Sequence, residues 1–264
     1  MGKAFNNIPQ KPPSSSSSVF SLSKLAYVAC FLGGLLLGCQ QYTKFTQQQQ
    51  ESLEQEVKPA AQVDAWDTRE YYPEDFEKHF GLRLIHQLEV PDYLKKYVDA
   101  HDVRNDPTFF QNPELSEAYA RVYGPFLDHP HTDDRRIYVK WAGADKHFGV
   151  FTKTYLPANA FVAEYAGMLT NSSFSTDYEW DYYSHDIVDD NGNVLKLGVD
   201  SQLVGNIARF VNHDDDPNCG IVYVPWRNRW RLVYVANKPI YPGEELSISY
   251  GPNYWESRQE VVKV

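Results

Sequence analysis

The stretch GNIARFVNHDDDPNC, residues 205–219, is the most informative part of the chain, and PGEELSISYG follows it at residues 242–251. Taken alone, Asn212-His213 before three aspartates is typical of a capped turn or an oxygen-rich cation site. Tyr250 alone is typical of a half-buried strand aromatic. The two stretches in this order form a far more specific combination than either one.

Three shorter segments precede these stretches: KHFGVF at 146–151, FVAEYAG at 161–167 and WDYY at 180–183. Gly149 and Gly167, taken singly, are typical of turns at strand ends. After residue 135, short apolar runs alternate with turn signals and predict strands without any long helix. These runs are 136–141, 161–165 and 230–236.

Together the segments resemble the SET domain of protein lysine methyltransferases, over roughly residues 135–258. The ending YGPNYWESR, residues 250–258, is most similar to compact viral and bacterial-type members without a cysteine-rich zinc-binding tail. The resemblance implies a mostly β fold with short helices, the SET-domain β-clip. It also implies a pseudoknot, in which one of the two long stretches passes through a loop formed by the other and brings Asn212-His213 beside Tyr250.

The resemblance assigns roles to individual residues. Tyr165 and Tyr250 would be catalytic and line a lysine channel, with the Tyr250 hydroxyl orienting the amine. The implied cofactor is S-adenosyl-L-methionine, held by Lys146, His147, Phe148, Gly149, Tyr183, Arg209, Phe210, Asn212 and His213. The resemblance also implies that Tyr165 and Ile248 contact the substrate. Charge, and not the resemblance, adds Asp214, Asp215 and Asp216 to the substrate-binding residues, because three acidic side chains beside the channel would attract a basic peptide.

The chemistry of such a reaction suits aromatic walls. Methyl transfer from a sulfonium to an amine requires a neutral amine, in line with the S–CH3 bond and shielded from water. A free lysine has a pKa of about 10.4, so neutralising it at pH 7 costs roughly 4–5 kcal/mol. An apolar channel beside a fixed positive charge lowers this cost because it destabilises the ammonium form.

Several positions depart from the family pattern. His147 stands where the cofactor loop usually has its first glycine, and its bulk disfavours positive φ. Asp214 replaces a usual Ser and Ser249 a usual Asp, which shifts the local charge. Cys219 matches a zinc-binding position of some relatives, but no cysteine follows it, so we expect no metal. Ile248 occupies a position where Phe or Tyr often tunes the number of methyl groups added.

Composition narrows the choice of partner. With 42% hydrophobic residues and 19 Tyr, most of the chain should fold. Three cysteines without a CxxC pair exclude a disulfide scaffold and a cysteine-rich zinc cluster. A net charge of -10 disfavours direct nucleic-acid binding and favours a basic, histone-like protein. Acidic residues concentrate between residues 177 and 216. For residues 177–190 a substrate-steering face and a merely solvated surface are both possible, whereas for residues 214–216 substrate steering is favoured.

The N-terminal part predicts a membrane connection. Residues 1–24 are rich in Ser and Pro and predict disorder. Residues 25–43 lack charge and would form a helix of about 28 Å, close to the thickness of a bilayer core. An uncleaved anchor, a signal peptide, a lipoprotein lipidated at Cys39 and a buried core helix all fit Leu25–Cys39. We therefore expect a membrane-associated protein, as a single-pass anchor or lipoprotein, or one delivered into a host cell.

The remaining segments complete the expected organisation. Residues 44–62 predict a polar stalk and 259–264 a C-terminal tail, on either side of a helical region at 63–134 and a SET domain at 135–258. Apolar spacings within the helical region predict three amphipathic helices, the last capped by Asn112. Their expected core stripes are Tyr72-Phe76-Phe80, Tyr93-Leu94-Tyr97 and Leu115-Tyr119-Val122.

These features favour a protein-lysine N-methyltransferase, of enzyme class EC 2.1.1, that uses S-adenosyl-L-methionine and acts on a basic protein such as a histone tail. One alternative is a SET-like binding module with weak catalysis, which the departures at His147 and Ser249 favour. The other is a membrane-anchored lipoprotein that binds a cationic ligand through its β domain.

Overall fold

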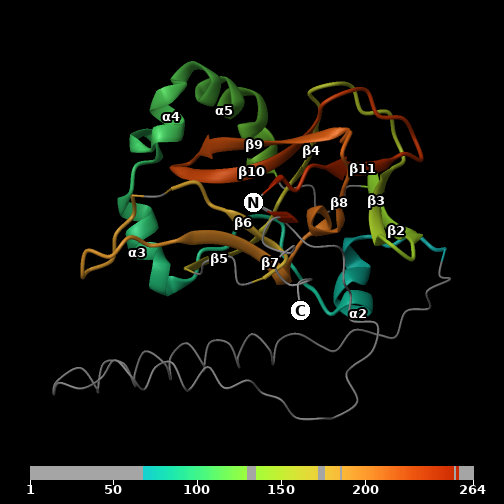
Figure 1. The fold of residues 1–264 in the computed structure, drawn as a ribbon, viewed down its shortest axis with the longest axis horizontal. Coiled ribbons are helices and arrows are strands. Elements are labelled where there is room, and N and C mark those ends of the chain that lie inside the picture. Colours follow the sequence, from blue (N-terminus) through green and yellow to red (C-terminus); the bar gives the residue numbers. More distant parts are fainter. Residues whose placement is uncertain (1–67, 130–134, 172–175, 185, 253, 256–264) are drawn as a thin grey trace, which may run out of the picture. The chain divides into compact units, whose positions relative to one another are not determined.

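The computed structural model describes residues 68–129, 135–171, 176–184, 186–252 and 254–255 (Figure 1). In these ranges, most helices precede residue 135 and most strands follow it, which confirms the predicted mostly β fold with short helices. The disordered N-terminus, the hydrophobic segment, the polar stalk and the C-terminal tail that the sequence predicts fall at 1–62 and 259–264, outside the described residues.

The expectation of a membrane-associated protein is contradicted. Across the described ranges, no helix combines the length and the apolar character that crossing a bilayer requires. Even α5 (Pro113–Asp128) has only 16 residues, whereas a spanning helix needs about 20. Residues 25–43, on which the expectation rested, lie outside these ranges.

The helix α5 begins where the sequence predicts, because the Asn112 side chain accepts a hydrogen bond from the backbone N–H of Leu115. Of the predicted core stripe, Tyr119 packs against the core, whereas Leu115 and Val122 are exposed and were predicted wrongly. The neighbouring stripe, Tyr123 and Leu127, is buried instead. The other helical elements are η2 (Pro73–Asp75), α2 (Phe76–Phe80), α3 (Asp92–Ala100), η3 (Val103–Asn105), α4 (Pro107–Gln111) and η4 (Ile207–Phe210).

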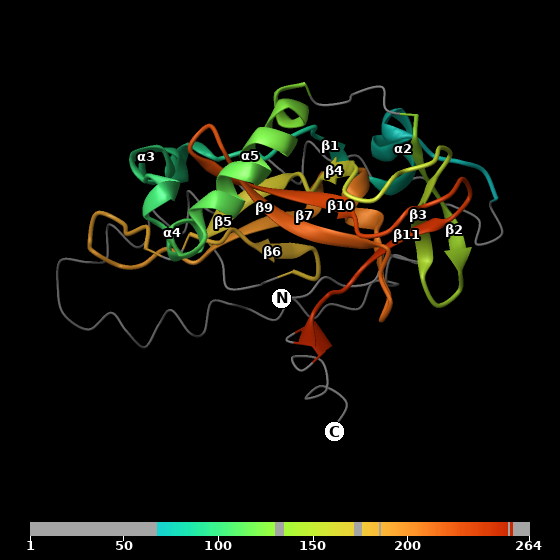
Figure 2. The same cartoon turned by 90° about the horizontal axis from the view of Figure 1, so that it is seen from above.

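The sheet beneath α5 explains why Tyr123 and Leu127, and not Leu115 and Val122, face the core. That sheet has the order β4 (Phe161–Glu164), β10 (Arg229–Ala236), β9 (Cys219–Trp226), and α5 lies along it (Figure 2). Gly124 packs directly on the Trp226 ring: a Cβ at this glycine would lie 2.2 Å from a ring carbon. This close approach turns the side of α5 that carries Tyr123 and Leu127 towards Val224 and Val233.

The described residues form two further sheets. One has the order β2 (Ile137–Gly143), β3 (His147–Thr152), β11 (Glu245–Ile248), β8 (Asn212–His213). The other has the order β1 (Arg83–Leu84), β7 (Leu197–Gly205), β5 (Gly167–Asn171), with β6 (Glu179–Asp181) also paired to β7.

The pairing of β8 with β11 is the feature that positions the site. The two strands run parallel, with Ser247 opposite Asn212 and Ile248 opposite His213. The backbone N–H of Asp214 extends the pairing by donating to the Ile248 carbonyl at 3.0 Å. The two long sequence stretches therefore lie side by side, as the resemblance implies.

Candidate active site

Tyr250 follows β11 and contacts the residues of β8. Its backbone N–H donates to Nδ1 of His213 at 3.1 Å, and the two rings lie 5.3 Å apart. Its hydroxyl donates to the Val211 carbonyl at 3.1 Å, and the side chain is fully buried. Because Nδ1 of His213 accepts a hydrogen bond, a neutral ring carries its proton on Nε2, which lies 3.1 Å from an Asp215 carboxylate oxygen.

Tyr250 belongs to a group of buried tyrosines, here called the tyrosine group, which consists of Tyr165, Tyr178, Tyr234 and Tyr250. Tyr165 donates its hydroxyl proton to the Tyr178 carbonyl at 2.6 Å, and its ring lies 5.9 Å from that of Tyr234. Burial raises the pKa of Tyr165, Tyr234 and Tyr250 well above the usual value for a phenol. At neutral pH these hydroxyls are protonated, so they act as hydrogen-bonding groups and not as bases.

The sequence did not single out Tyr178 or Tyr234. Tyr234 lies within the apolar run 230–236, where alternation gives no reason to separate a site residue from the core. The neighbouring phenols Tyr165 and Tyr250 contribute, after burial, to the raised pKa of Tyr234, which places it close to both predicted catalytic residues.

A polar network joins β3, β8 and β11 beside His213. The Asn212 side-chain amide donates to the Phe148 carbonyl at 3.2 Å and to Oε1 of Glu245 at 2.8 Å. Oε2 of Glu245 accepts from Lys146 Nζ at 3.0 Å. The structure thus brings together Lys146, Phe148 and Asn212 from the predicted cofactor residues. Glu245 was missed, although it lies within the quoted stretch 242–251.

Gly149 makes this network possible. A Cβ at Gly149 would lie 2.6 Å from Glu245 Oε1 and 3.1 Å from Asn212 Nδ2. We expect Gly149→Ala to separate these two side chains and to weaken binding of S-adenosyl-L-methionine, the cofactor that the resemblance implies, by about tenfold, the equivalent of one lost hydrogen bond. Isothermal titration checks this result. Gly220→Ala is the matched control, because Gly220 lies on β9 and the atoms nearest to its added Cβ would belong to the Asn237 side chain, which is not part of the network. A tenfold loss of affinity in this variant as well would contradict the explanation.

His147 adopts a positive φ, the conformation predicted to be unfavourable for its bulky side chain. Its φ is 61°, in the left-handed region, and its ring contacts Trp141 edge-on at 5.5 Å. A residue other than glycine in this region stores strain.

We expect His147→Gly to raise the free energy of unfolding by about 1 kcal/mol, because glycine adopts this φ without a steric penalty. Urea denaturation of the variant and the unaltered chain measures the change. An unchanged or lower stability would mean that the contact with Trp141 outweighs the strain.

The contacts described for Tyr183, Arg209 and Phe210, which were also predicted to bind the cofactor, lie outside the network of Lys146, Glu245 and Asn212. Tyr183 stacks on Tyr223, with ring centroids 4.0 Å apart. Arg209 donates from Nε to the Ser201 carbonyl at 2.8 Å, and its guanidinium lies 4.0 Å above the Tyr178 ring. Phe210 is fully buried. It packs against the aromatic rings of α2, Phe76 and Phe80.

The three predicted substrate-binding aspartates form a turn after β8. Asp214 Oδ1 accepts from the backbone N–H of Asp216 at 2.9 Å, and the Asp216 carboxylate binds Lys238 Nζ at 2.9 Å. Asp215 is fully exposed apart from its contact with His213. Ile248 is fully buried on β11.

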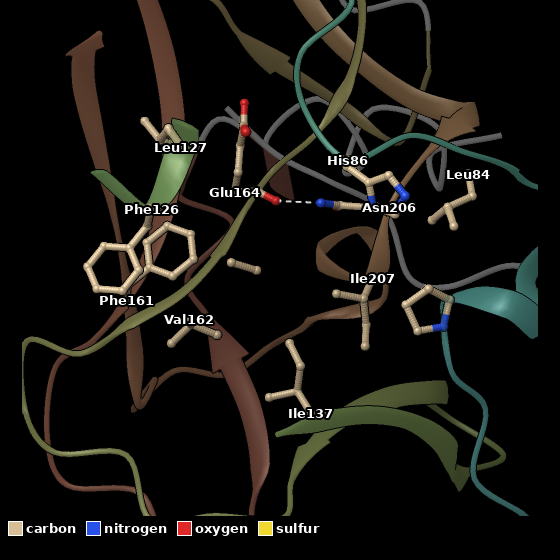
Figure 3. Close-up of a pocket in the computed structure, with 12 residues that line it drawn as sticks. Leu84, His86, Phe126, Leu127, Ile137, Phe161, Val162, Glu164, Asn206 and Ile207 are labelled. Atoms are coloured by element: carbon tan, nitrogen blue, oxygen red, sulfur yellow. Dashed lines mark hydrogen bonds between the residues drawn. The ribbon is translucent and has the colours of Figure 1, made fainter. Parts of the chain in front are cut away.

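Figure 3 shows a small cavity behind β4, where the Asn206 side-chain amide donates to the Glu164 carbonyl at 2.8 Å. Phe126, Val162 and Ile207 are among its apolar walls, and its volume is about 60 Å³. Sites for drug-sized ligands occupy roughly 300–1,000 Å³. The cavity is therefore too small for a nucleoside cofactor.

Comparison with known proteins finds similar sequences among histone-lysine N-methyltransferases. Mouse histone-lysine N-methyltransferase EHMT1 is 31% identical over 116 residues, 42% of this chain and 9% of that protein. Rat histone-lysine N-methyltransferase SETMAR is 34% identical over 123 residues, 41% of this chain and 38% of that protein. The chain thus spans well under half the length of either relative.

Among solved structures, KRYPTONITE in complex with mCHH DNA, an H3(1-15) peptide and SAH is 28% identical, with a TM-score of 0.37, over 44% of this chain and 23% of that one. ATXR5 in complex with histone H3.1 mono-methylated on R26 is 17% identical, with a TM-score of 0.43, over 64% and 80%. The family model for the SET domain matches residues 147–251. This match includes Asn212, His213 and Tyr250, and the stretch from 147 to 251 is a SET domain.

Proposed function

We propose that this chain is a protein-lysine N-methyltransferase that uses S-adenosyl-L-methionine and acts on a basic, histone-like protein. The observation that carries the proposal is the parallel pairing of β8 with β11, which holds the Tyr250 amide against His213 and its buried hydroxyl near Tyr178. The names of the aligned relatives, histone-lysine N-methyltransferases, support the same reaction class.

The chemistry of the network beside β3 fits the cofactor. Bound S-adenosyl-L-methionine supplies the methyl group from a sulfonium. Lys146 and Glu245 present opposite charges at a partly exposed position, which complements the carboxylate and ammonium of the amino-acid end of the cofactor. Asn212 is held by two acceptors and is preorganised for this role.

The tyrosine group has two tasks in this proposal. Its buried rings exclude water, which favours the neutral form of an incoming lysine because the ammonium form loses its hydration. The hydroxyls of Tyr165 and Tyr250 are protonated and fixed by backbone carbonyls, so their lone pairs orient the amine. The lysine therefore transfers its proton to solvent, and not to a phenolate, before the methyl group moves.

The negative charge of the chain and of the loop after β8 favours a basic peptide as the substrate. Asp215 is exposed next to His213, and the chain carries a net charge of -10. A peptide with several basic residues around the target lysine would be steered to this loop.

Transfer of labelled methyl groups from S-adenosyl-L-methionine to mixed core histones tests the proposal. We expect labelling of histones by the unaltered chain and its loss in Asn212→Ala, which removes the two hydrogen bonds that the Asn212 side chain donates. Cofactor binding without any transfer would favour the alternative of a catalytically weak binding module. Absence of both binding and transfer would overturn the proposal.

A further inference from the structure

Asp106 is a fully buried carboxylate in the helical region that precedes the SET domain. Its Oδ2 accepts hydrogen bonds from the Ser184 hydroxyl at 2.6 Å and from the Trp230 indole N–H at 2.7 Å. Its Oδ1 lies 2.8 Å from Nε2 of His101. One side chain between η3 and α4 thus joins the end of α3, the segment after β6 and the start of β10.

The segment after β6 is held closely at this point. Ser184 and Trp230 are buried, and the Trp230 backbone N–H donates to the Tyr182 hydroxyl at 3.3 Å. The Tyr182 backbone N–H donates to the Leu197 carbonyl of β7 at 3.1 Å. Since a buried carboxylate with three donors is costly to disrupt, Asp106 fixes Ser184 more firmly than an exposed contact could.

The same segment reaches the tyrosine group at its other end. The Tyr178 carbonyl accepts from the Tyr165 hydroxyl, and the Trp180 ring lies edge-on to the Tyr165 ring at 6.2 Å. Residues 178–184 therefore form one wall of the proposed channel, and this wall is anchored to Asp106 at Ser184.

We propose that Asp106 is a positioning residue for methyl transfer, acting through the wall formed by residues 178–184; this inference rests on the proposed function. A displacement of about 1 Å in a reacting group can reduce the rate about 100-fold. The cofactor network of Lys146, Glu245 and Asn212 belongs to other strands, β8 and β11, and to the start of β3. Tyr183, which lies in this wall, stacks on Tyr223. Loss of Asp106 is therefore expected to act on turnover and not on cofactor binding.

A second contact joins the helical region to Asp190, six residues after the wall formed by residues 178–184, and supplies a control. Lys96 of α3 binds the Asp190 carboxylate, which also accepts from the Tyr97 hydroxyl at 2.9 Å. Both Lys96 and Asp190 are largely exposed. Solvent screens such a pair, and its contribution is small.

The experiment uses the full chain with Asp106→Ala, Asp106→Asn, Ser184→Ala and Lys96→Ala. We expect Asp106→Ala to lower kcat for histone methylation at least tenfold and to accelerate amide hydrogen exchange in residues 178–184, while the cofactor Kd changes less than twofold. Asp106→Asn should restore most of kcat, because its amide oxygen accepts from Ser184 and Trp230 while its NH2 faces His101. Lys96→Ala should match the unaltered chain.

Other outcomes separate the two proposals. Unchanged kcat and exchange in Asp106→Ala, or equal losses in kcat and cofactor affinity, would overturn the positioning role alone. If Asp106→Ala does not fold, Ser184→Ala decides: a threefold or greater fall in kcat at unchanged cofactor Kd supports the role, and an unaltered kcat refutes it. Absence of transfer by the unaltered chain would overturn the proposed function and the positioning role together, even where exchange in residues 178–184 responds to Asp106.

Discussion

Tyr250→Phe is expected to reduce kcat for methyl transfer by roughly 100- to 1,000-fold, the range found when one preorganised hydrogen-bonding group is removed from an active site. The hydroxyl is fully buried, donates to the Val211 carbonyl and keeps its proton at neutral pH because burial raises its pKa. Phenylalanine preserves the ring contacts with His213 but cannot orient an amine. Single-turnover rates with saturating cofactor and peptide measure the effect.

The matched control for this variant is Tyr123→Phe. Tyr123 is also buried and donates its hydroxyl proton to a backbone carbonyl, that of Asn159 at 3.2 Å. It lies on α5 and packs in the core beneath that helix. Its loss should cost about 1 kcal/mol of stability and leave kcat near that of the unaltered chain. Similar losses of kcat in both variants would indicate a general effect of removing a buried hydroxyl, and would sink the assigned role of Tyr250.

Arg231→Met is expected to lower the free energy of unfolding by about 3–5 kcal/mol at pH 7, because it leaves the Glu164 carboxylate buried without its partner. Arg231 binds Glu164 through two contacts, at 2.5 and 2.6 Å, and both side chains are buried. Denaturant unfolding followed by tryptophan fluorescence measures this change. A variant as stable as the unaltered chain would contradict the importance of the pair.

The pH dependence of Arg231→Met has a definite sign. Burial raises the pKa of Glu164 even beside Arg231, and loss of the guanidinium raises it further. The folded state then binds more protons than the unfolded state between the ordinary glutamate pKa of about 4.3 and the raised value, so stability falls as pH rises through that window. The deficit of the variant should therefore be smaller at pH 5 than at pH 7.

The double variant Glu164→Leu with Arg231→Met tests whether the unpaired buried carboxylate causes the loss of stability in Arg231→Met. Replacing both charges by apolar side chains removes the buried unpaired carboxylate, so we expect most of the lost stability to return. The same substitutions would remove the pH dependence described for Arg231→Met. A double variant no more stable than Arg231→Met would show that packing, and not the uncompensated charge, sets the cost.

The helix α5 shows why local patterns were not enough for the core. Asn112 predicted the start of the helix correctly, because a cap depends on residues adjacent in sequence. Two apolar stripes are present on the helix, Leu115 with Val122 and Tyr123 with Leu127, and periodicity does not choose between them. Gly124 determines which stripe is buried, because its missing side chain leaves room for the Trp226 ring of a strand about 100 residues later.

The sequence by itself determined the SET domain and the meeting of Asn212-His213 with Tyr250, because those residues are part of ordered motifs whose pairing is built into the domain. Only the tertiary structure revealed Glu245 between Lys146 and Asn212, Tyr234 in the tyrosine group, and Asp106 beneath Ser184. A buried polar side chain takes its meaning from the donors and acceptors around it, and these come from distant segments whose proximity no local pattern records.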